Sequence, residues 1–145
     1  MTQIKTLALA LTLVPGIALA QAAKPGSHFL ENWDLNDDGA ITVEEITTRR
    51  ADVFYMFDVD ANDALDAQEY VLFDETRAAD MRNAGEAAGK GAHKVQIGLT
   101  LAFNDFDADG QVSKDEFIAR SPDWFATIDR NADGVITSAD FGPMN

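Results

Sequence analysis

The sequence contains no cysteine and only two histidines, His28 and His93, in 145 residues. The absence of cysteine excludes disulfide bonds, thiolate zinc sites, iron–sulfur clusters and a cysteine nucleophile. Two imidazoles are too few for a metal site built from several histidines. Basic residues are also scarce, because 11 Lys and Arg stand against 25 Asp and Glu, a formal charge of −14. The chain therefore lacks the clustered cations that bind nucleic acids or anionic membranes.

Catalytic signatures are also missing. The chain shows no Ser-His-Asp set, no phosphate-binding P-loop, no G-x-G-x-x-G turn and no H-E-x-x-H helix. We therefore expect no enzymatic activity. Hydrophobic residues make up 46% of the chain, which is enough for a packed core. The length predicts one compact domain or two small halves.

The first 20 residues have the features of a secretory signal. A positive residue precedes an apolar stretch from Leu7 to Leu19, and Ala18-Leu19-Ala20 places small residues where a signal peptidase requires them. The apolar stretch is shorter than the roughly 20 residues of a membrane-spanning helix. We predict cleavage after Ala20, with Ala22 and Ala23 as alternatives, and export to a bacterial periplasm or the exterior. Residues 21–145 then carry 10 basic and 25 acidic residues, a formal charge of −15, and no membrane span.

Four acidic stretches recur at a regular spacing along the rest of the chain. They begin at Asp34, Asp58, Asp105 and Asp129, so the starts are 24 residues apart within each of two pairs. Residues 83–92 contain three glycines and are predicted to be a flexible linker or a broken helix. The chain is therefore predicted to be a duplicated pair, with residues 21–82 and 93–145 as its halves.

Each stretch can be interpreted as a loop that wraps a hard divalent cation. Calcium takes roughly six to eight oxygens, which a short loop supplies when alternate residues point inward. The loop also needs a sharp turn and a distant carboxylate that closes the coordination sphere. The ligands predicted for loop 1 (residues 34–45) are Asp34, Asn36, Asp38, the carbonyl of Ala40, Thr42 and Glu45. Those predicted for loop 3 (residues 105–116) are Asp105, Asp107, Asp109, the carbonyl of Gln111, Ser113 and Glu116. Both loops match D-x-[DN]-x-[DN]-G-x₅-E in full.

The other two loops depart from this pattern at one position each. The ligands predicted for loop 2 (residues 58–69) are Asp58, Asp60, Asn62, the carbonyl of Ala64, Asp66 and Glu69. Those predicted for loop 4 (residues 129–140) are Asp129, Asn131, Asp133, the carbonyl of Val135, Thr137 and Asp140. Loop 2 has Asp63 in place of the turn glycine, which predicts strain rather than failure of the turn, because Asp tolerates the left-handed region better than most residues. Loop 4 closes with Asp140, whose shorter reach predicts weak calcium binding and possible occupancy by magnesium, unless the C-terminal end adapts.

This pattern resembles the EF-hand family of calcium-binding proteins, four times over. The resemblance implies an all-α fold of two EF-hand pairs, with short inner helices and small β-bridges between paired loops. In that family the eighth loop residue forms the bridge, and here these residues are Ile41, Leu65, Val112 and Ile136. The family has an apolar residue before each loop, as at Trp33, Phe57 and Ile128 but not at Asn104. It has another after each loop, as at Ile46, Tyr70, Phe117 and Phe141.

The connection within each predicted pair is short, because only 12 residues separate loop 1 from loop 2 and loop 3 from loop 4. One continuous helix there would hold the two loops at its opposite ends. Ser121-Pro122-Asp123 is typical of a helix start, so we predict two short helices at 114–120 and 122–128. By alignment of the halves, a similar break is predicted near Arg50. Further helices are predicted at 27–33, 67–83 and 94–104, and most phenylalanines are expected to fill two small cores.

These features predict an exported calcium-binding protein that acts as a sensor or a buffer. The alternative is a protein-interaction module in which calcium is structural and the partner protein is unidentified. A catalytic subunit is the least favoured reading. Calcium titration separates the first two, because a sensor changes its exposed apolar surface over the working range and a structural module stays saturated.

Overall fold

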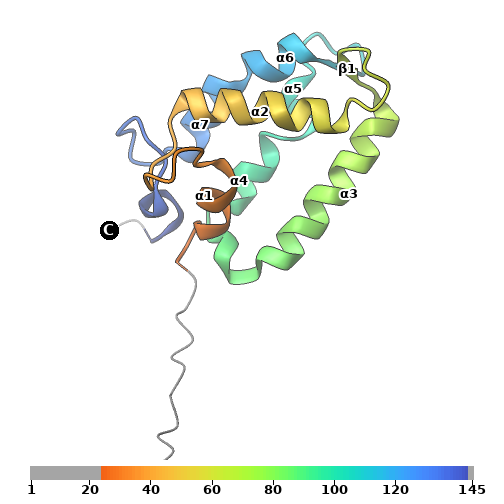
Figure 1. Ribbon diagram of the computed structural model, residues 1–145. Helices are drawn as coiled ribbons and strands as arrows, with labels where there is room; N and C mark the ends of the chain where they lie inside the picture. Colours follow the sequence, from red (N-terminus) through yellow and green to blue (C-terminus); the bar gives the residue numbers. More distant parts are fainter. Residues whose placement is uncertain (1–23, 144–145) are drawn as a thin grey trace, which may run out of the picture.

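The computed structural model describes residues 24–143 (Figure 1). The predicted signal segment, residues 1–20, lies outside the described residues. The elements are α1 (Ser27–Trp33), α2 (Val43–Phe57), β1 (Ala64–Leu65), α3 (Ala67–Ala84), the 3₁₀-helix η1 (Gly85–Ala88), α4 (Ala92–Ile97), α5 (Leu101–Asn104), β2 (Val112–Ser113), α6 (Lys114–Ala119), α7 (Ser121–Ile128) and the 3₁₀-helix η2 (Ser138–Phe141). The fold is all-α apart from one two-stranded sheet, as predicted.

The helix that follows each loop begins with a capping box. In loop 1 the Thr42 side chain accepts a hydrogen bond from the Glu45 backbone, and the Glu45 side chain accepts one from the Thr42 backbone. The same reciprocal pair starts α3, α6 and η2. The ninth and twelfth residues of each loop therefore determine where the next helix starts.

Helix α2 is continuous, which corrects the predicted break near Arg50. Ala51 stands where the second half has Pro122, so nothing in the sequence interrupts the α2 hydrogen-bond ladder. The helix has 15 residues and is about 22 Å long. It therefore holds loop 1 at one end and loop 2 at the other, too far apart to pair (Figure 1).

The loops pair across the two halves of the chain. Ile41 and Ile136 form an antiparallel bridge between loops 1 and 4, with N–O distances of 2.8 and 2.9 Å. Strands β1 and β2 pair Leu65 with Val112 and so join loops 2 and 3. The four predicted bridge residues are correct, but the predicted pairing of loop 1 with loop 2 and of loop 3 with loop 4 is wrong. The continuous α2 accounts for this result.

In the second half, the break between α6 and α7 is confirmed. Pro122 lies in the first turn of α7, where its missing N–H costs no hydrogen bond. The hydroxyl of Ser121 does not cap this helix, because it is buried without a hydrogen-bond partner. The helix predicted at 94–104 is interrupted at Gly98 and divides into α4 and α5. A side chain at Gly98 would clash with Trp124, since an added Cβ would lie 1.7 Å from its ring.

Both halves contribute to one hydrophobic core rather than to two small ones. Helix α2 lies along α6 and α7, while α3 diverges from α2 and returns through η1 toward α1 (Figure 1). Phe54 contacts Phe117 at a ring-centroid distance of 5.8 Å, and Trp33 contacts Trp124 at 4.7 Å. The glycine-rich segment near residues 89–91 packs on Phe141 at the edge of this core. Within residues 24–143, no helix combines the length and the apolar character needed to cross a membrane.

Candidate metal centre

All four loops have the same backbone turn. The sixth residue of each has positive φ: 85° at Gly39, 62° at Asp63, 90° at Gly110 and 87° at Gly134. The fourth residues, Asp37, Ala61, Ala108 and Ala132, are also left-handed. Asp63 therefore adopts the turn without glycine, as predicted. An L-residue at this φ is strained by about 1 kcal/mol, less for Asp than for most residues.

The first aspartate of each loop organises the backbone around it. One of its oxygens accepts a hydrogen bond from the amide of the sixth residue. The distances are 2.7 Å for Asp34–Gly39, 3.1 Å for Asp58–Asp63, 3.1 Å for Asp105–Gly110 and 3.0 Å for Asp129–Gly134. The fifth residue accepts in turn from the amide of the seventh, at 2.8–3.1 Å. Side-chain oxygens from the first, third and fifth positions are thus held within the curve of one loop.

The closing carboxylate of each loop is buried and folds back over the loop. In loop 1, Glu45 accepts hydrogen bonds from the amides of Leu35 and Thr42 at 3.0 and 2.9 Å. Glu69 makes the equivalent contacts in loop 2, at 2.7 and 3.0 Å. The ninth residues, Thr42, Asp66, Ser113 and Thr137, use their side chains to cap the next helix. Ligation from this position through water fits that arrangement.

Loop 4 closes as the others do, although its last residue is Asp140. The two oxygens of Asp140 accept from the amides of Arg130 and Thr137, at 2.9 and 2.8 Å. The exit from this loop is the 3₁₀-helix η2, which is tighter than an α-helix and brings the shorter side chain inward. Arg130 also donates to the carbonyls of Asp140 and Gly142, at 2.8 Å each. Asp140 therefore reaches the same loop amides as the glutamates of the other loops, while its predicted weaker closure on calcium stays a prediction.

Two of the loops bring three carboxylates together. Oxygens of Asp58, Asp60 and Glu69 lie within 4.8 Å of one another in loop 2, and so do those of Asp105, Asp107 and Asp109 in loop 3. In loop 3, one oxygen of Glu116 is buried and makes no hydrogen bond of normal geometry, although the nearby amides of Phe106 and Asp107 favour its charged form and lower its pKa. A buried carboxylate oxygen without a partner is costly, and a divalent cation at that place would satisfy it. The residues of loop 3 therefore fit a calcium ion.

The electrostatics of loop 3 reflect this crowding of acids. Burial acts to raise the pKa of Glu116, but hydrogen bonds from the Ser113 backbone and hydroxyl hold the pKa below its usual range. The amide of Asp109 donates to Asp107 and favours its charged form. Desolvation and repulsion from the other loop carboxylates outweigh that bond and raise the pKa of Asp107. A bound cation would relieve the repulsion.

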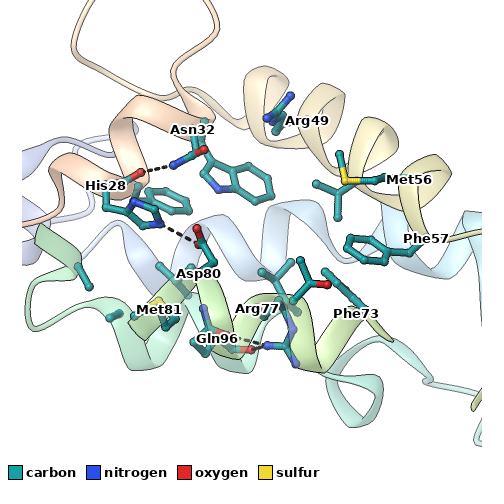
Figure 2. Close-up of a pocket in the computed structure, with 18 of the residues that line it drawn as sticks. His28, Asn32, Arg49, Met56, Phe57, Phe73, Arg77, Asp80, Met81 and Gln96 are labelled. Carbon is teal, nitrogen blue, oxygen red and sulfur yellow. Dashed lines mark hydrogen bonds and ion pairs between the residues drawn. The ribbon is translucent and has the colours of Figure 1, made fainter. Parts of the chain in front are cut away.

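A pocket of about 210 Å³ lies away from the loops, among α1, α2, α3 and α4 (Figure 2). Its walls are mostly apolar and include Phe57 and Met56 from α2 and Phe73 from α3. At one side, His28 of α1 contacts Asp80 of α3 at 2.8 Å. Helices α2 and α3, which line this pocket, directly follow loops 1 and 2. The sequence analysis did not predict the pocket, because its lining comes from segments far apart in the chain.

The structure places every predicted ligand in its loop, and the loops form two clusters. Loops 1 and 4 lie side by side at one end of α2, and loops 2 and 3 at the other. Sequence analysis missed the role of Arg50, which is fully buried and bonded to Asn104. The sequence did contain a sign of this role at Asn104. The residues directly before the other three loops are apolar, and Asn104 is polar.

Comparison with protein families agrees with this geometry. The family model described as EF hand matches residues 30–48 and 123–142, which contain loops 1 and 4. These are the two loops joined by the Ile41–Ile136 bridge. The matches support an EF-hand family and indicate calcium binding. A comparison with curated proteins gives no match.

Proposed function

We propose that the protein binds calcium in four loops and acts, after export, as a calcium sensor in the periplasm or the exterior. The observation that carries calcium binding is the buried Glu116 oxygen that makes no hydrogen bond of normal geometry, at the end of a loop whose other acids already converge. All four loops share the turn and the folded-back closing carboxylate. Export rests on the N-terminal sequence pattern. Extracellular modules of this chemistry often bind calcium at roughly 10⁻⁴–10⁻³ M.

The pocket favours a sensor over a buffer. A sensor must change the apolar surface that it exposes, and the pocket walls belong to the helices that loops 1 and 2 control. Calcium binding and release would change how firmly Glu45 and Glu69 are held against their loops. Because these residues stand in the first turns of α2 and α3, both helices would move with them. A buffer needs no such surface.

The second candidate is an interaction module in which calcium is structural. The shared core favours it, because loops 1 and 4 and loops 2 and 3 are already bridged through backbone hydrogen bonds. Such a module would hold its ions at every working calcium concentration. Its partner protein would bind the same surface at every working calcium concentration.

Native mass spectrometry and calorimetric calcium titration, with and without magnesium, test the proposal. Four bound ions would change the charge of residues 21–145 from −15 to about −7, since each adds two positive charges. No more than one bound ion would refute it. Glu69→Gln should remove one site of four, while Glu75→Gln on the same helix should remove none. An apolar dye that responds across the titration supports the sensor, and an unchanging dye signal supports the structural module.

A further inference from the structure

The middle of α2 carries a buried cation. Arg50 is fully buried, and its guanidinium donates four hydrogen bonds to a distant part of the chain. Its Nε and Nη2 donate to the Phe117 carbonyl at 3.0 and 2.6 Å, and Nη1 donates to the Gly98 carbonyl at 3.1 Å. Its Nη2 also donates to Oδ1 of Asn104 at 2.6 Å. A single side chain thus binds three points between residues 98 and 117.

Two of these points are the two ends of loop 3. Asn104 directly precedes Asp105, the first predicted ligand, and Phe117 directly follows Glu116, the last. Asn104 is itself fixed, because its Nδ2 donates to the carbonyls of Gly98 and Thr100 at 3.2 and 2.7 Å. Arg50 therefore bridges the two chain segments that must approach each other when loop 3 closes on an ion.

The cation has no compensating acid among the described residues, where every ion pair involves other side chains. Its guanidinium lies over the Phe117 ring at 3.9 Å and near the Trp124 ring at 5.0 Å. Burial lowers the pKa of Arg50 to about 9, which reflects the desolvation cost of the charged form. Buried ionic groups are often no more stabilising than well-packed apolar residues. The hydrogen bonds that Arg50 makes therefore explain why an arginine is buried here better than a contribution to the stability of the fold does.

The internal repeat shows that loop 1 lacks this arrangement. A shift of 71 positions aligns the halves, so that Arg50 corresponds to Ser121 and Asn104 to Trp33. The Ser121 hydroxyl is buried but makes no hydrogen bond, and Trp33 is apolar. Loop 1, the counterpart of loop 3, is therefore not bridged in this way.

We infer that Arg50 is a positioning residue for loop 3, which holds the two ends of the loop at the spacing required for cation binding. The inference rests on the proposed calcium binding. A loop whose ends are already fixed loses less conformational freedom when it closes, so its affinity is higher than its ligands alone would give. The planar guanidinium fork can bond Phe117 and Asn104 at once, which a lysine ammonium does less well.

The test is a calcium titration of the whole protein followed by NMR, with one backbone amide as the reporter for each loop. The amides of Gly39, Gly110 and Gly134 each donate to the first aspartate of their own loop, so they report loops 1, 3 and 4. Arg50→Met should raise the calcium concentration for half-saturation at Gly110 by about tenfold, as expected for the loss of one or two net hydrogen bonds. The shifts at Gly39 and Gly134 should be less than about threefold on the same scale.

Three variants complete the experiment. Arg50→Lys keeps the charge and should shift Gly110 by only about threefold, which is a partial rescue. Arg49→Met removes a partly buried arginine from the same helix, and Ser121→Ala changes the repeat-equivalent residue. Neither control should shift any loop by more than about twofold.

The outcomes separate the inference from the function on which it rests. An equal shift in all three loops, or no shift at Gly110, would overturn the positioning role while calcium binding stands. If Arg50→Met does not fold, Arg50→Lys replaces it. A shift confined to Gly110 in that variant supports the positioning role, and no shift or an equal shift in all three loops overturns it. Wild-type amides that do not respond to calcium would overturn the proposed function, and the inference with it.

Discussion

Lengthening the carboxylate that closes loop 4 should weaken calcium binding there. Asp140 is only 2% exposed, and both of its oxygens already make the contacts that Glu45 makes in loop 1. Asp140→Glu adds one methylene to a buried side chain whose two oxygens are held by the amides of Arg130 and Thr137. An extra methylene in a well-packed place costs about 1–3 kcal/mol. If this cost destabilises the calcium-bound conformation of loop 4, the calcium affinity of that loop decreases by roughly 5–150-fold.

The assay is the titration followed at the Gly134 amide, with competition by magnesium. We expect half-saturation of loop 4 to move to higher calcium by roughly 30-fold, the middle of that range. Loop 1 should follow weakly through the Ile41–Ile136 bridge, and loop 3 should not change. Tighter calcium binding at loop 4, with reduced magnesium competition, would refute the reasoning. It would mean that the aspartate is too short and that η2 does not compensate.

Two further predictions concern tryptophan fluorescence and backbone strain. Trp33 and Trp124 are in edge contact at 4.7 Å, so Trp33→Phe should change the calcium-dependent emission of the remaining indole, Trp124. A Trp124 signal that is unaltered would contradict that contact. Asp63→Gly should raise the melting temperature of the calcium-free protein by about 2 °C, because it relieves left-handed strain of less than about 1 kcal/mol. Asp63→Asn, which keeps a side chain at φ 62°, should raise the melting temperature less. An equal rise in both variants would mean that removal of the Asp63 charge, and not relief of strain, stabilises the protein.

Interactions within about a dozen residues were predictable from the sequence. The four loops were predictable, because the alternating oxygen ligands, the turn residue and the closing carboxylate all lie within 12 positions. The starts of α2 and α6 followed from the same residues, since Thr42–Glu45 and Ser113–Glu116 form local capping boxes. The break before α7 was predictable because Pro122 disrupts a helix interior but is tolerated in the first turn of a new helix.

The partners of these local units were decided only by the tertiary structure. The halves align, so symmetry predicted a break near Arg50, but α2 stays straight because no proline interrupts it and its buried face packs on α6 and α7. A straight α2 separates loops 1 and 2, and each then pairs with a loop from the other half. The sequence contained both Arg50 and Asn104, but 54 positions apart. Only the packing of one shared core brings that charge against the ends of loop 3, because long-range contacts depend on the whole fold rather than on local chemistry.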